Sequence, residues 1–550
     1  MAQYTRYVEA HGAFVSYEDF YKNFRVRRPE RFHFAFDVAD VLAAETPDAP
    51  ALVWAAPNGT QDSYTFAQMK QASDRAASLL RGLGVGKGDA VLLLLKTHHE
   101  YWPLVLALHK LGAVAAPCST LLSAQDIAYR ARNTRARLVV CTAEDGLPDR
   151  AEAAAALCPD AWQCLLVRGT RAGWHSYEAL ATQADPHFER PTGDQAVAPE
   201  DPMLLYFTSG TSGLPRMVTL DHAYPLAHIV TAVHWQRVTE GGLHLTLCDT
   251  GWSKSAWGQL YGQWLGGSGV FVWDAGDALS PDALLEAMAR HGVTTLCAPP
   301  MAYRALLGAD FSAHDLRALT HCTLTAEPLH PDIFCQWEEH TGLTLHEAYG
   351  LTETAVLVGN FAWGKVQPGS MGRPSPLYDV DVVDEHGKTC PPGVSGELVV
   401  RTHHGVPLGM FQGYANDEES TREAWHDGLF HTGDVAWRDE WGFYWYVSRA
   451  DDVIRSSGYR IGPFEVEAAL MEHPAVLEAA VTGVPDPLRH QVVKATVVLR
   501  PGYTPGDALA RELQQHVKGI TAPYKYPRIV AFAETLPRTN SGKLRRSALR

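Results

Sequence analysis

Two stretches of the chain alternate a continuous apolar run with an amphipathic helix pattern. In the first, AVLLLL at 90–95 precedes HEYWPLVLALHKLGA, and VAAPCS follows. In the second, PDALLEAMARHG at 281–292 precedes VTTLCAPP. Strands that are apolar throughout are buried on both faces, and strands joined through helices run parallel. The pattern therefore predicts an α/β fold whose parallel sheets carry helices on both faces.

The pattern changes in the last third of the chain. Between about 370 and 447, short strands such as YDVDVVD and GELVVRT are separated by Pro and Gly, which predicts a small antiparallel β subdomain. After SRADD, helix patterns at 462–472 and 507–518 alternate with strand patterns, which is typical of a compact α+β domain. We expect a large N-terminal domain over 1–450 and a small mobile C-terminal domain over 451–550.

Composition limits the possible partners. A chain of 550 residues with 46% hydrophobic and 20% charged residues is typical of a globular protein with more than one core. The net charge of -15 argues against nucleic acid or an anionic membrane as a partner. No segment reaches 18 uninterrupted apolar residues, and the N-terminus lacks the apolar core of a signal peptide, so we expect a cytoplasmic protein without membrane insertion. The nine cysteines show no zinc-site spacing, which favours reduced thiols.

A loop rich in glycine and hydroxyl side chains lies within YFTSGTSGLPRMVTL at 206–220. Glycines let backbone N–H groups converge on an anion, and Ser and Thr add hydroxyl donors. The loop is therefore a candidate phosphate site, although an isolated cluster of this kind is also typical of a solvated surface loop. A P-loop ATPase would need GxxxxGK[ST] before a helix, and SGTSGLPR does not match this motif.

Four further motifs follow in order: EAYGLTET (347–354), FHTGDVAW (430–437), SRADDVIRSSGYRIGPFEVE (448–467) and PRTNSGKLRR (537–546). Together with FTSGTSGLPR they resemble the adenylate-forming superfamily of acyl-CoA synthetases, adenylation domains and luciferases. CDTGWSKSAWGQLYGQWLGG, PGSMGRPSP and TAPYKYPR are similar to segments of the medium-chain acyl-CoA synthetases. The resemblance implies that ATP and a carboxylate form an acyl-adenylate, from which the thiol of coenzyme A displaces AMP. It implies ATP, Mg²⁺ and coenzyme A as cofactors and a small carboxylic acid as substrate.

The resemblance also implies an ATP site around the glycine-rich loop. Residues 208–216 would surround the β- and γ-phosphates, with Thr211 and Glu353 at Mg²⁺. Tyr349 would stack on adenine, and Asp434 would accept hydrogen bonds from both ribose hydroxyls. The residues implied to contact ATP or AMP are Thr208, Ser209, Gly210, Thr211, Ser212, Gly213, Glu327, Tyr349, Gly350, Thr352, Asp434, Arg449 and Arg460.

The residues implied to be catalytic are Lys543, Glu353 and Arg216. Lys543 would stabilise negative charge at the substrate carboxylate and the α-phosphate. Arg216 stands where the family usually has Lys, so a planar fork replaces a compact ammonium. Ala326 in TAEP is a second departure, because relatives carry Gly there and the methyl limits backbone freedom beside adenine.

The second half-reaction is implied to use a rotated C-terminal domain, with Asp451 as the hinge. Coenzyme A would then contact Ser457, Gly458 and Tyr459 through its pantetheine arm, and Arg489 and Tyr526 through its nucleotide end.

The acyl pocket is implied to include Trp252, for which an ordinary core position is the alternative, and Gly350. Acetate-activating relatives carry Trp where Gly350 stands, which predicts room for an acid longer than acetate. We expect a short- to medium-chain acid, with branched or aromatic acids open.

The sequence therefore predicts an AMP-forming acyl-CoA ligase, with two alternatives. An adenylation enzyme that loads a carrier protein would keep nearly all of these motifs, although no carrier domain follows residue 550. The other alternative is a non-catalytic acyl- or nucleotide-binding relative, because of Arg216 and Ala326. The residues that argue against it are Glu353, Asp434, Arg449 and Lys543.

Overall fold

The computed structural model describes residues 2–9, 14–158, 162–209, 215–276, 279–327, 329, 331–364, 366–457, 459–538 and 544–550. The chain divides into two compact units. The first comprises Met1–Asp379 and Thr402–Glu423, and the second comprises Val380–Arg401 and Ala424–Arg550. The domain boundary expected at residue 450 stays a prediction. No helix in the described ranges is long and apolar enough to cross a membrane.

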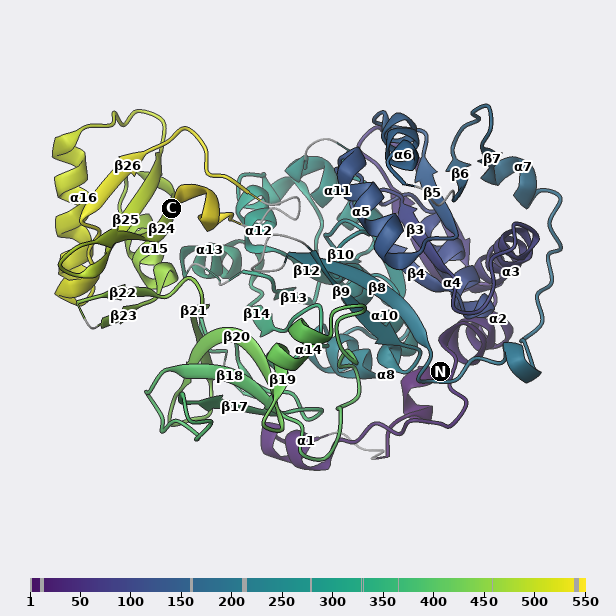
Figure 1. Cartoon of the computed structure of the whole chain (residues 1–550), viewed down its shortest axis with the longest axis horizontal. Coiled ribbons are helices and arrows are strands. Elements are labelled where there is room, and N and C mark those ends of the chain that lie inside the picture. The colour runs from purple at the N-terminus through teal and green to yellow at the C-terminus, as the bar shows by residue number, and fades with distance from the viewer. Residues whose placement is uncertain are drawn as a thin grey trace. The chain divides into compact units, whose positions relative to one another are not determined.

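A seven-stranded sheet in the first unit contains the first of the two predicted stretches (Figure 1). β3 (Ala90–Leu94) is followed by α4 (Tyr101–Leu111) and β4 (Val114–Pro117), and the two strands pair in parallel. All residues of β3 are buried, as expected of a strand covered on both faces. The sheet order is β7-β6-β5-β3-β4-β8-β9. The remaining strands are β5 (Leu138–Thr142), β6 (Gln163–Val167), β7 (His175–Ser176), β8 (Pro202–Ser209) and β9 (Pro215–Asp221).

A nine-stranded sheet contains the second predicted stretch. α11 (Pro281–His291) begins with Pro at its first position and ends at Gly292, which has a φ of +67° that favours glycine. β12 (Thr295–Ala298) follows and pairs in parallel with β10 and β13. The sheet order is β16-β15-β14-β13-β12-β10-β11-β1-β2. Its other strands are β1 (Pro50–Ala55), β2 (Gln61–Thr65), β10 (Leu243–Thr246), β11 (Gly269–Trp273), β13 (His321–Leu324), β14 (Leu345–Tyr349), β15 (Val358–Gly359) and β16 (Arg373–Pro374).

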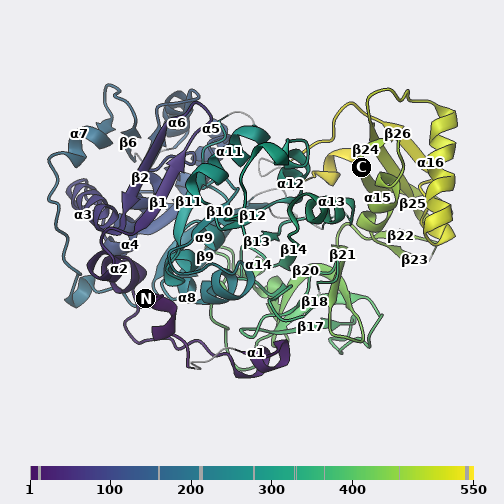
Figure 2. The ribbon, with the colours of Figure 1, turned by 180° about the vertical axis from the view of Figure 1, so that it is seen from behind.

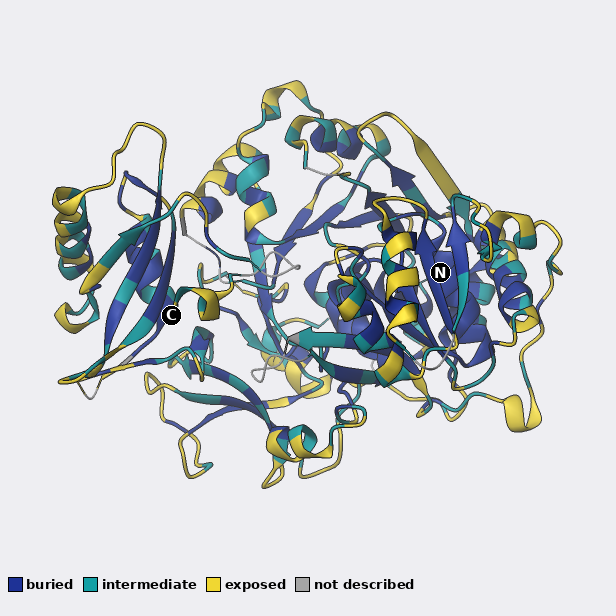
Figure 3. Cartoon of the chain, turned by 45° about the horizontal axis from the view of Figure 1, so that its top comes forward, coloured by how far each residue is buried: buried dark blue, intermediate teal, exposed yellow. Residues whose placement is uncertain are grey.

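The helices of the first unit accompany these sheets. They are α1 (Tyr17–Asn23), α2 (Asp40–Glu45), α3 (Phe66–Gly82), α5 (Ala124–Thr134), α6 (Leu147–Ala156), α7 (Tyr177–Ala181), α8 (Tyr224–Ile229), α9 (Lys254–Gly258), α10 (Tyr261–Leu265), α12 (Pro300–Leu306), α13 (Pro331–Thr341) and α14 (Glu418–Ala424), whose last residue falls in the second unit. Figure 3 shows most strands buried and several helices with exposed residues on their outer faces. The helix faces that pack against the sheets are apolar, as the helix periodicity predicts.

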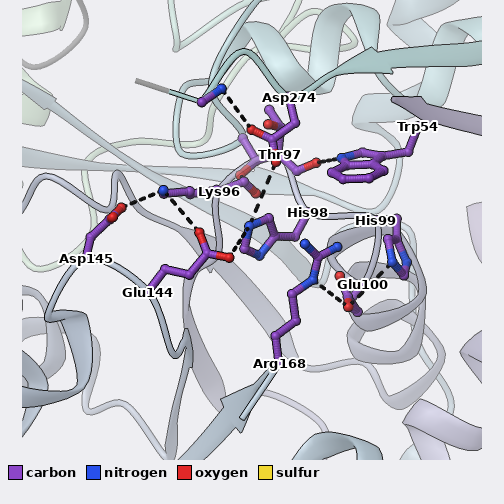
Figure 4. Close-up of polar contacts among 12 residues, drawn as sticks. Trp54, Lys96, Thr97, His98, His99, Glu100, Glu144, Asp145, Arg168 and Asp274 are labelled. Carbon is purple, nitrogen blue, oxygen red and sulfur yellow. Dashed lines mark hydrogen bonds and ion pairs between the residues drawn. The ribbon is translucent and has the colours of Figure 1, made fainter. Parts of the chain in front are cut away.

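A polar cluster connects the seven-stranded sheet to the nine-stranded sheet (Figure 4). The Trp54 indole N–H, on β1, donates to the carbonyl oxygen of Thr97 after β3 at 2.7 Å. His98 Nε2 lies 3.9 Å from Asp274 Oδ2, directly after β11. The other labelled members of this cluster are Lys96, His99, Glu100, Glu144, Asp145 and Arg168. The carboxyl ends of β3 and β11 therefore adjoin, and ligands of α/β folds bind beyond such strand ends.

The second unit contains two smaller sheets, seen from behind in Figure 2. The first is antiparallel, with the order β17-β18-β20-β19 and β21 beside β20. Its strands are β17 (Asp379–Val383), β18 (Gly396–Arg401), β19 (Trp425–His426), β20 (Leu429–Arg438) and β21 (Tyr444–Arg449). The second has the order β23-β22-β25-β24, with β26 parallel to β25. Its elements are β22 (Ile454–Ser456), β23 (Tyr459–Ile461), α15 (Pro463–Met471), β24 (Val476–Asp486), β25 (His490–Leu499), α16 (Asp507–Ile520) and β26 (Ile529–Phe532). The predicted α/β fold with an antiparallel region toward the C-terminus is confirmed.

Candidate active site

The predicted phosphate loop connects two strands of a β-hairpin. β8 and β9 pair in antiparallel register, with Thr208 opposite Arg216, and Ser209 ends β8. The register is fixed because Tyr206 and Val218, opposite each other in the same hairpin, are both buried. The remaining predicted loop residues, Gly210, Thr211, Ser212 and Gly213, lie outside the described residues.

Arg216 lies between an aromatic ring and a carboxylate. Its guanidinium carbon is 5.2 Å from the centroid of the Tyr414 ring, and its Nη2 is 3.6 Å from Glu423 Oε2. The side chain is only 21% exposed. A guanidinium can stack on an aromatic face while its edge stays available to an anion. The structure therefore places a cation directly beside the stem of the glycine-rich loop.

Glu353 is buried in the segment after β14, and it accepts a hydrogen bond from the same tyrosine. The Tyr414 hydroxyl donates to Glu353 Oε1 at 2.9 Å. Tyr414 thus connects Glu353, the predicted metal ligand, with Arg216, the predicted phosphate cation. No sequence pattern predicts this contact, because Tyr414 lies 61 residues from Glu353 in a polar loop.

The donor set around Glu353 fits Mg²⁺ that arrives with a nucleotide. Mg²⁺ is usually bound through one or two carboxylates together with substrate phosphates and waters, rather than by a complete protein cage. Among the residues that the structure describes, no group of three or more His, Cys, Asp or Glu side chains could hold a metal ion. A single buried carboxylate near the predicted phosphate loop suits Mg²⁺ that is bound together with substrate phosphates and waters.

Gly350 directly follows β14, whose last residue is Tyr349. A Cβ at Gly350 would lie 2.4 Å from Trp257 Cη2 and 2.6 Å from the Ala355 carbonyl oxygen. Trp257, a fully buried side chain of α9, therefore occupies the space directly beside Gly350. The room expected there for an acid longer than acetate stays a prediction. The sequence analysis selected Trp252 from the same segment; Trp252 is half-buried, two residues before α9.

A buried ammonium lies against Trp257. Lys254 Nζ is 3.4 Å from the centroid of the Trp257 ring and donates to Thr325 Oγ1 at 3.3 Å. The neighbouring Ser253 hydroxyl is 3.1 Å from the Thr352 hydroxyl. This contact links the start of α9 to the Gly350–Glu353 segment. The predicted acyl-pocket residues therefore lie close to the predicted metal ligand. Lys254 and Trp257 were not predicted as site residues, although both stand in the quoted CDTGWSKSAW segment.

Two unusual residues lie near the predicted adenine position. Ala326 has a φ of +91°, in the left-handed region that favours glycine. Relatives carry Gly at this point, so the substitution leaves a strained backbone directly before Glu327. Glu347 lies two residues before Tyr349 on β14 and is buried. Burial raises the pKa of its carboxyl to about 8, and a backbone hydrogen bond from Leu329 partly opposes this shift. Glu347 is therefore mostly protonated at neutral pH.

Asp434 and Arg449 lie directly opposite each other on β20 and β21. Arg449 Nη1 donates to Asp434 Oδ1 at 3.3 Å and to the Thr432 carbonyl oxygen at 3.1 Å. A Cβ at Gly433, whose φ is +69°, would lie 2.9 Å from Arg449 Nη2. Glycine at this position therefore leaves room for the guanidinium. The two residues predicted to hold ribose are in contact.

The residues after Lys543 are anchored within the second unit. Arg546 Nη2 donates to both carboxylate oxygens of buried Glu467, at 2.9 and 2.7 Å. Arg550 donates to the carbonyl oxygen of Asp451 at 3.0 Å and to Asp452 Oδ1 at 2.6 Å. Lys543 itself lies outside the described residues, so its position stays a prediction. The predicted hinge and the C-terminal segment are nevertheless in direct contact.

Several predicted coenzyme A residues lie around β22 and β25. The Ser457 N–H donates to the Arg489 carbonyl oxygen at 3.0 Å. Tyr459 stacks on Tyr524, with centroids 3.9 Å apart, and is half exposed. Lys518 Nζ lies 4.0 Å from the ring centroid of Tyr526. Two further predicted positions fall outside the description: all of Gly458, and the side chain of Arg460, which belongs to β23.

Known proteins match this chain over nearly its whole length. Residues 40–415 match the family model of the AMP-binding enzymes, and residues 465–543 match that of the AMP-binding enzyme C-terminal domain. The mitochondrial acyl-coenzyme A synthetase ACSM5 of Mus musculus is 41% identical, covering 95% of this chain and 91% of its own. The mitochondrial ACSM3 of Homo sapiens is 38% identical, covering 98% and 92%.

Solved structures agree with these matches. The anthranilate CoA ligase AuaEII in complex with anthranoyl-AMP has a TM-score of 0.84 and 29% identity, covering 95% of this chain and 97% of its own. A benzoate CoA ligase from Burkholderia xenovorans LB400 has a TM-score of 0.82 and 26% identity, covering 94% and 100%. The chain belongs to the AMP-binding enzyme family and, within it, to the acyl-coenzyme A synthetases.

Proposed function

We propose that this AMP-forming acyl-coenzyme A synthetase acts on a short- to medium-chain carboxylic acid, with aromatic acids within its range. The observation that carries the proposal is the Tyr414 side chain, which joins one carboxylate, Glu353, to one cation, Arg216, beside the phosphate loop. A carboxylate is a poor electrophile at neutral pH. Adenylation converts it to a mixed anhydride from which AMP can leave, and coenzyme A then takes the acyl group as a thioester.

The first half-reaction uses the phosphate loop and Glu353. Thr208 to Gly213 surround the β- and γ-phosphates, and Arg216 neutralises part of their charge. Glu353 and Thr211 would hold Mg²⁺, which would supply positive charge to offset that of the triphosphate. Lys543 stabilises the charge that develops at the α-phosphate, with Arg460 beside it. Arg546 lies three residues after Lys543 and donates to buried Glu467. This contact supports a defined place for the C-terminal segment.

The nucleoside is held by residues of different chemical types. Tyr349 stacks on adenine, with Gly350, Thr352 and Glu327 along the same surface. Asp434 accepts hydrogen bonds from the ribose hydroxyls and Arg449 supports it, a division supported by their 3.3 Å contact. Burial favours the neutral form of Glu347, two residues before Tyr349 on β14.

The acid lies toward α9, and we propose that Trp257 limits its length. Gly350 and Trp252 were the predicted pocket residues, and the contact of Gly350 with Trp257 supports adding Trp257 and Lys254 to them. An indole in this place suits short or flat acids and leaves little depth for long ones.

The second half-reaction uses the C-terminal domain, 451–550, as a mobile lid. Rotation about Asp451 would exchange Lys543 for the coenzyme A residues. Ser457, Gly458 and Tyr459 contact the pantetheine arm, and Arg489 and Tyr526 contact the nucleotide end. The exposure of Tyr459, which stacks on Tyr524, supports this role because its ring is accessible to a ligand.

The sequence predicts a cytoplasmic protein, whereas ACSM5 and ACSM3 are mitochondrial. All nine cysteines are free, which suits any reducing compartment.

Pyrophosphate release from ATP tests the proposal, measured with a panel of straight, branched and aromatic acids, each with and without coenzyme A. We expect release to depend on the acid, and the acyl thioester to form with free coenzyme A. If a thioester formed only on a phosphopantetheinylated protein, the enzyme would instead load a carrier. The absence of release with every acid would favour the non-catalytic relative.

A further inference from the structure

One tyrosine contacts two predicted site residues through different parts of its side chain. The Tyr414 hydroxyl donates to Glu353 Oε1 at 2.9 Å, while its ring face lies 5.2 Å from the Arg216 guanidinium carbon. Glu423 Oε2 approaches Arg216 from another direction at 3.6 Å. Arg216 and Glu353 are therefore held at a fixed separation by one rigid side chain. An aromatic ring has only two rotatable side-chain bonds, so little entropy is lost in holding it there.

The backbone around Tyr414 is attached to the elements that carry both partners. Tyr414 forms an antiparallel bridge with Val218, on the same strand as Arg216. The next residue, Ala415, donates its N–H to the Met217 carbonyl oxygen at 2.8 Å. Three residues before Tyr414, the Phe411 N–H donates to the Glu353 carbonyl oxygen at 2.8 Å. The segment 411–415 thus spans from the metal ligand to the stem of the phosphate loop.

The acceptor of the Tyr414 hydroxyl is a buried carboxylate oxygen. A hydrogen bond to an ionised acceptor is stronger than one between neutral groups, and it has a preferred direction at the carboxylate. Its loss would remove one restraint on the orientation of the Glu353 carboxylate.

We propose that Tyr414 is a positioning residue of the adenylation site. Its hydroxyl orients the Glu353 carboxylate toward the metal, and its ring keeps the Arg216 guanidinium at the phosphate loop. The inference rests on the proposed metal role of Glu353. It also explains how the chain accommodates Arg where relatives carry Lys, because a planar guanidinium stacks on Tyr414 better than an ammonium does.

The test measures equilibrium ATP binding by calorimetry, with increasing Mg²⁺ and with EDTA, on the purified full chain. Tyr414→Phe removes the hydroxyl and keeps the ring. We expect it to raise the Mg²⁺ concentration needed for half-maximal enhancement of ATP binding by about 10-fold, and to leave ATP binding in EDTA within about twofold. Tyr414→Leu also removes the ring, and should weaken ATP binding in EDTA by a further 3- to 5-fold or so.

Two further variants separate the possible failures. Tyr303→Phe is the matched control, because Tyr303 is also buried and its hydroxyl donates to the Thr323 carbonyl oxygen at 2.8 Å, outside the proposed site. It should leave the Mg²⁺ dependence unchanged. Glu353→Gln should raise the Mg²⁺ requirement, and adding Tyr414→Phe to it should cause no further change.

If Glu353→Gln left the Mg²⁺ dependence unchanged, the metal role of Glu353 would fail, and the inference with it. If Glu353→Gln raised the Mg²⁺ requirement but Tyr414→Phe did not, the function of Glu353 would stand and the role of Tyr414 would be overturned. A change in Tyr303→Phe as large as that in Tyr414→Phe would also overturn it, because loss of any buried hydroxyl would then suffice.

Discussion

Trp257 contacts Gly350 so closely that even a methyl group at residue 350 would lie 2.4 Å from the indole. A side chain at position 350 would therefore displace Trp257, which already occupies that space. We propose Trp257, in addition to Gly350, as a determinant of acyl length.

We expect Trp257→Leu to shift preference toward longer acids. Removing part of the indole opens volume for additional methylenes, each worth about 0.8 kcal/mol when buried, or roughly fourfold in kcat/KM. The measurement is the ratio of kcat/KM for octanoate to that for butyrate. Trp337→Leu is the control, because Trp337 is a fully buried core residue that packs on Tyr303. An unchanged ratio in Trp257→Leu would remove Trp257 from the acyl pocket.

Ala326→Gly should stabilise the protein. The observed φ of +91° is strained for alanine and unstrained for glycine, and relief of such strain is worth about 1 kcal/mol after the entropy cost of glycine is subtracted. Differential scanning calorimetry should show a small rise in Tm, together with a lower KM for ATP. Ala289→Gly, within helix α11, is the opposite control and should lower stability by about 1 kcal/mol. Equal destabilisation by both changes would contradict the assignment of strain.

Acidification should destabilise the protein through buried histidines. Burial is the largest cause that lowers the pKa of His109, His228, His244 and His321 to about 3. Because these values lie below the unfolded value of about 6.5, the unfolded chain binds more protons below that pH. The stability that they contribute is present above pH 6.5 and is lost as the pH falls toward 3, at about 1.4 kcal/mol per pH unit for each histidine.

Tm measured between pH 7.5 and 5.5 checks this expectation. His244→Gln should reduce the slope, whereas His404→Gln, at an exposed position, should not. Parallel curves for His244→Gln and the unmodified chain would show that the buried imidazole does not control the acid response.

Arg546→Ala should destabilise the second unit strongly. It leaves the Glu467 carboxylate buried without its bidentate partner, which costs about 3–5 kcal/mol. Replacing both residues, in Glu467→Met with Arg546→Met, should cost much less because no charge is left buried. Calorimetric unfolding distinguishes the two, and a double variant less stable than Arg546→Ala would contradict the expectation.

The local sequence pattern was enough to predict strands and helices such as β3, β12 and α11. It was not enough to predict the side-chain contacts of the candidate site. The apolar runs of β3 and β12 and the glycine that ends α11 are visible in sequence, because burial and backbone conformation restrict residue types locally. The selection of Asp434 and Arg449 as ribose residues followed from a resemblance to known motifs, whereas their contact with each other comes from the structure. The contacts of Trp257 with Gly350 and of Tyr414 with Glu353 were missed, since they join residues far apart in the chain and no periodicity marks them. The strain at Ala326 was partly foreseen, because the resemblance pointed to glycine there.

Transfer of ¹⁸O from the acid tests the central claim, that the chain activates acids as acyl-adenylates, most directly. The enzyme is incubated with ATP, Mg²⁺, coenzyme A and an acid labelled in both carboxylate oxygens, and the products are analysed by mass spectrometry. The account predicts one ¹⁸O in the phosphate of AMP and none in pyrophosphate, because the carboxylate oxygen that attacks the α-phosphorus leaves with AMP. Label in inorganic phosphate with formation of ADP, or thioester formation without labelled AMP, would contradict it.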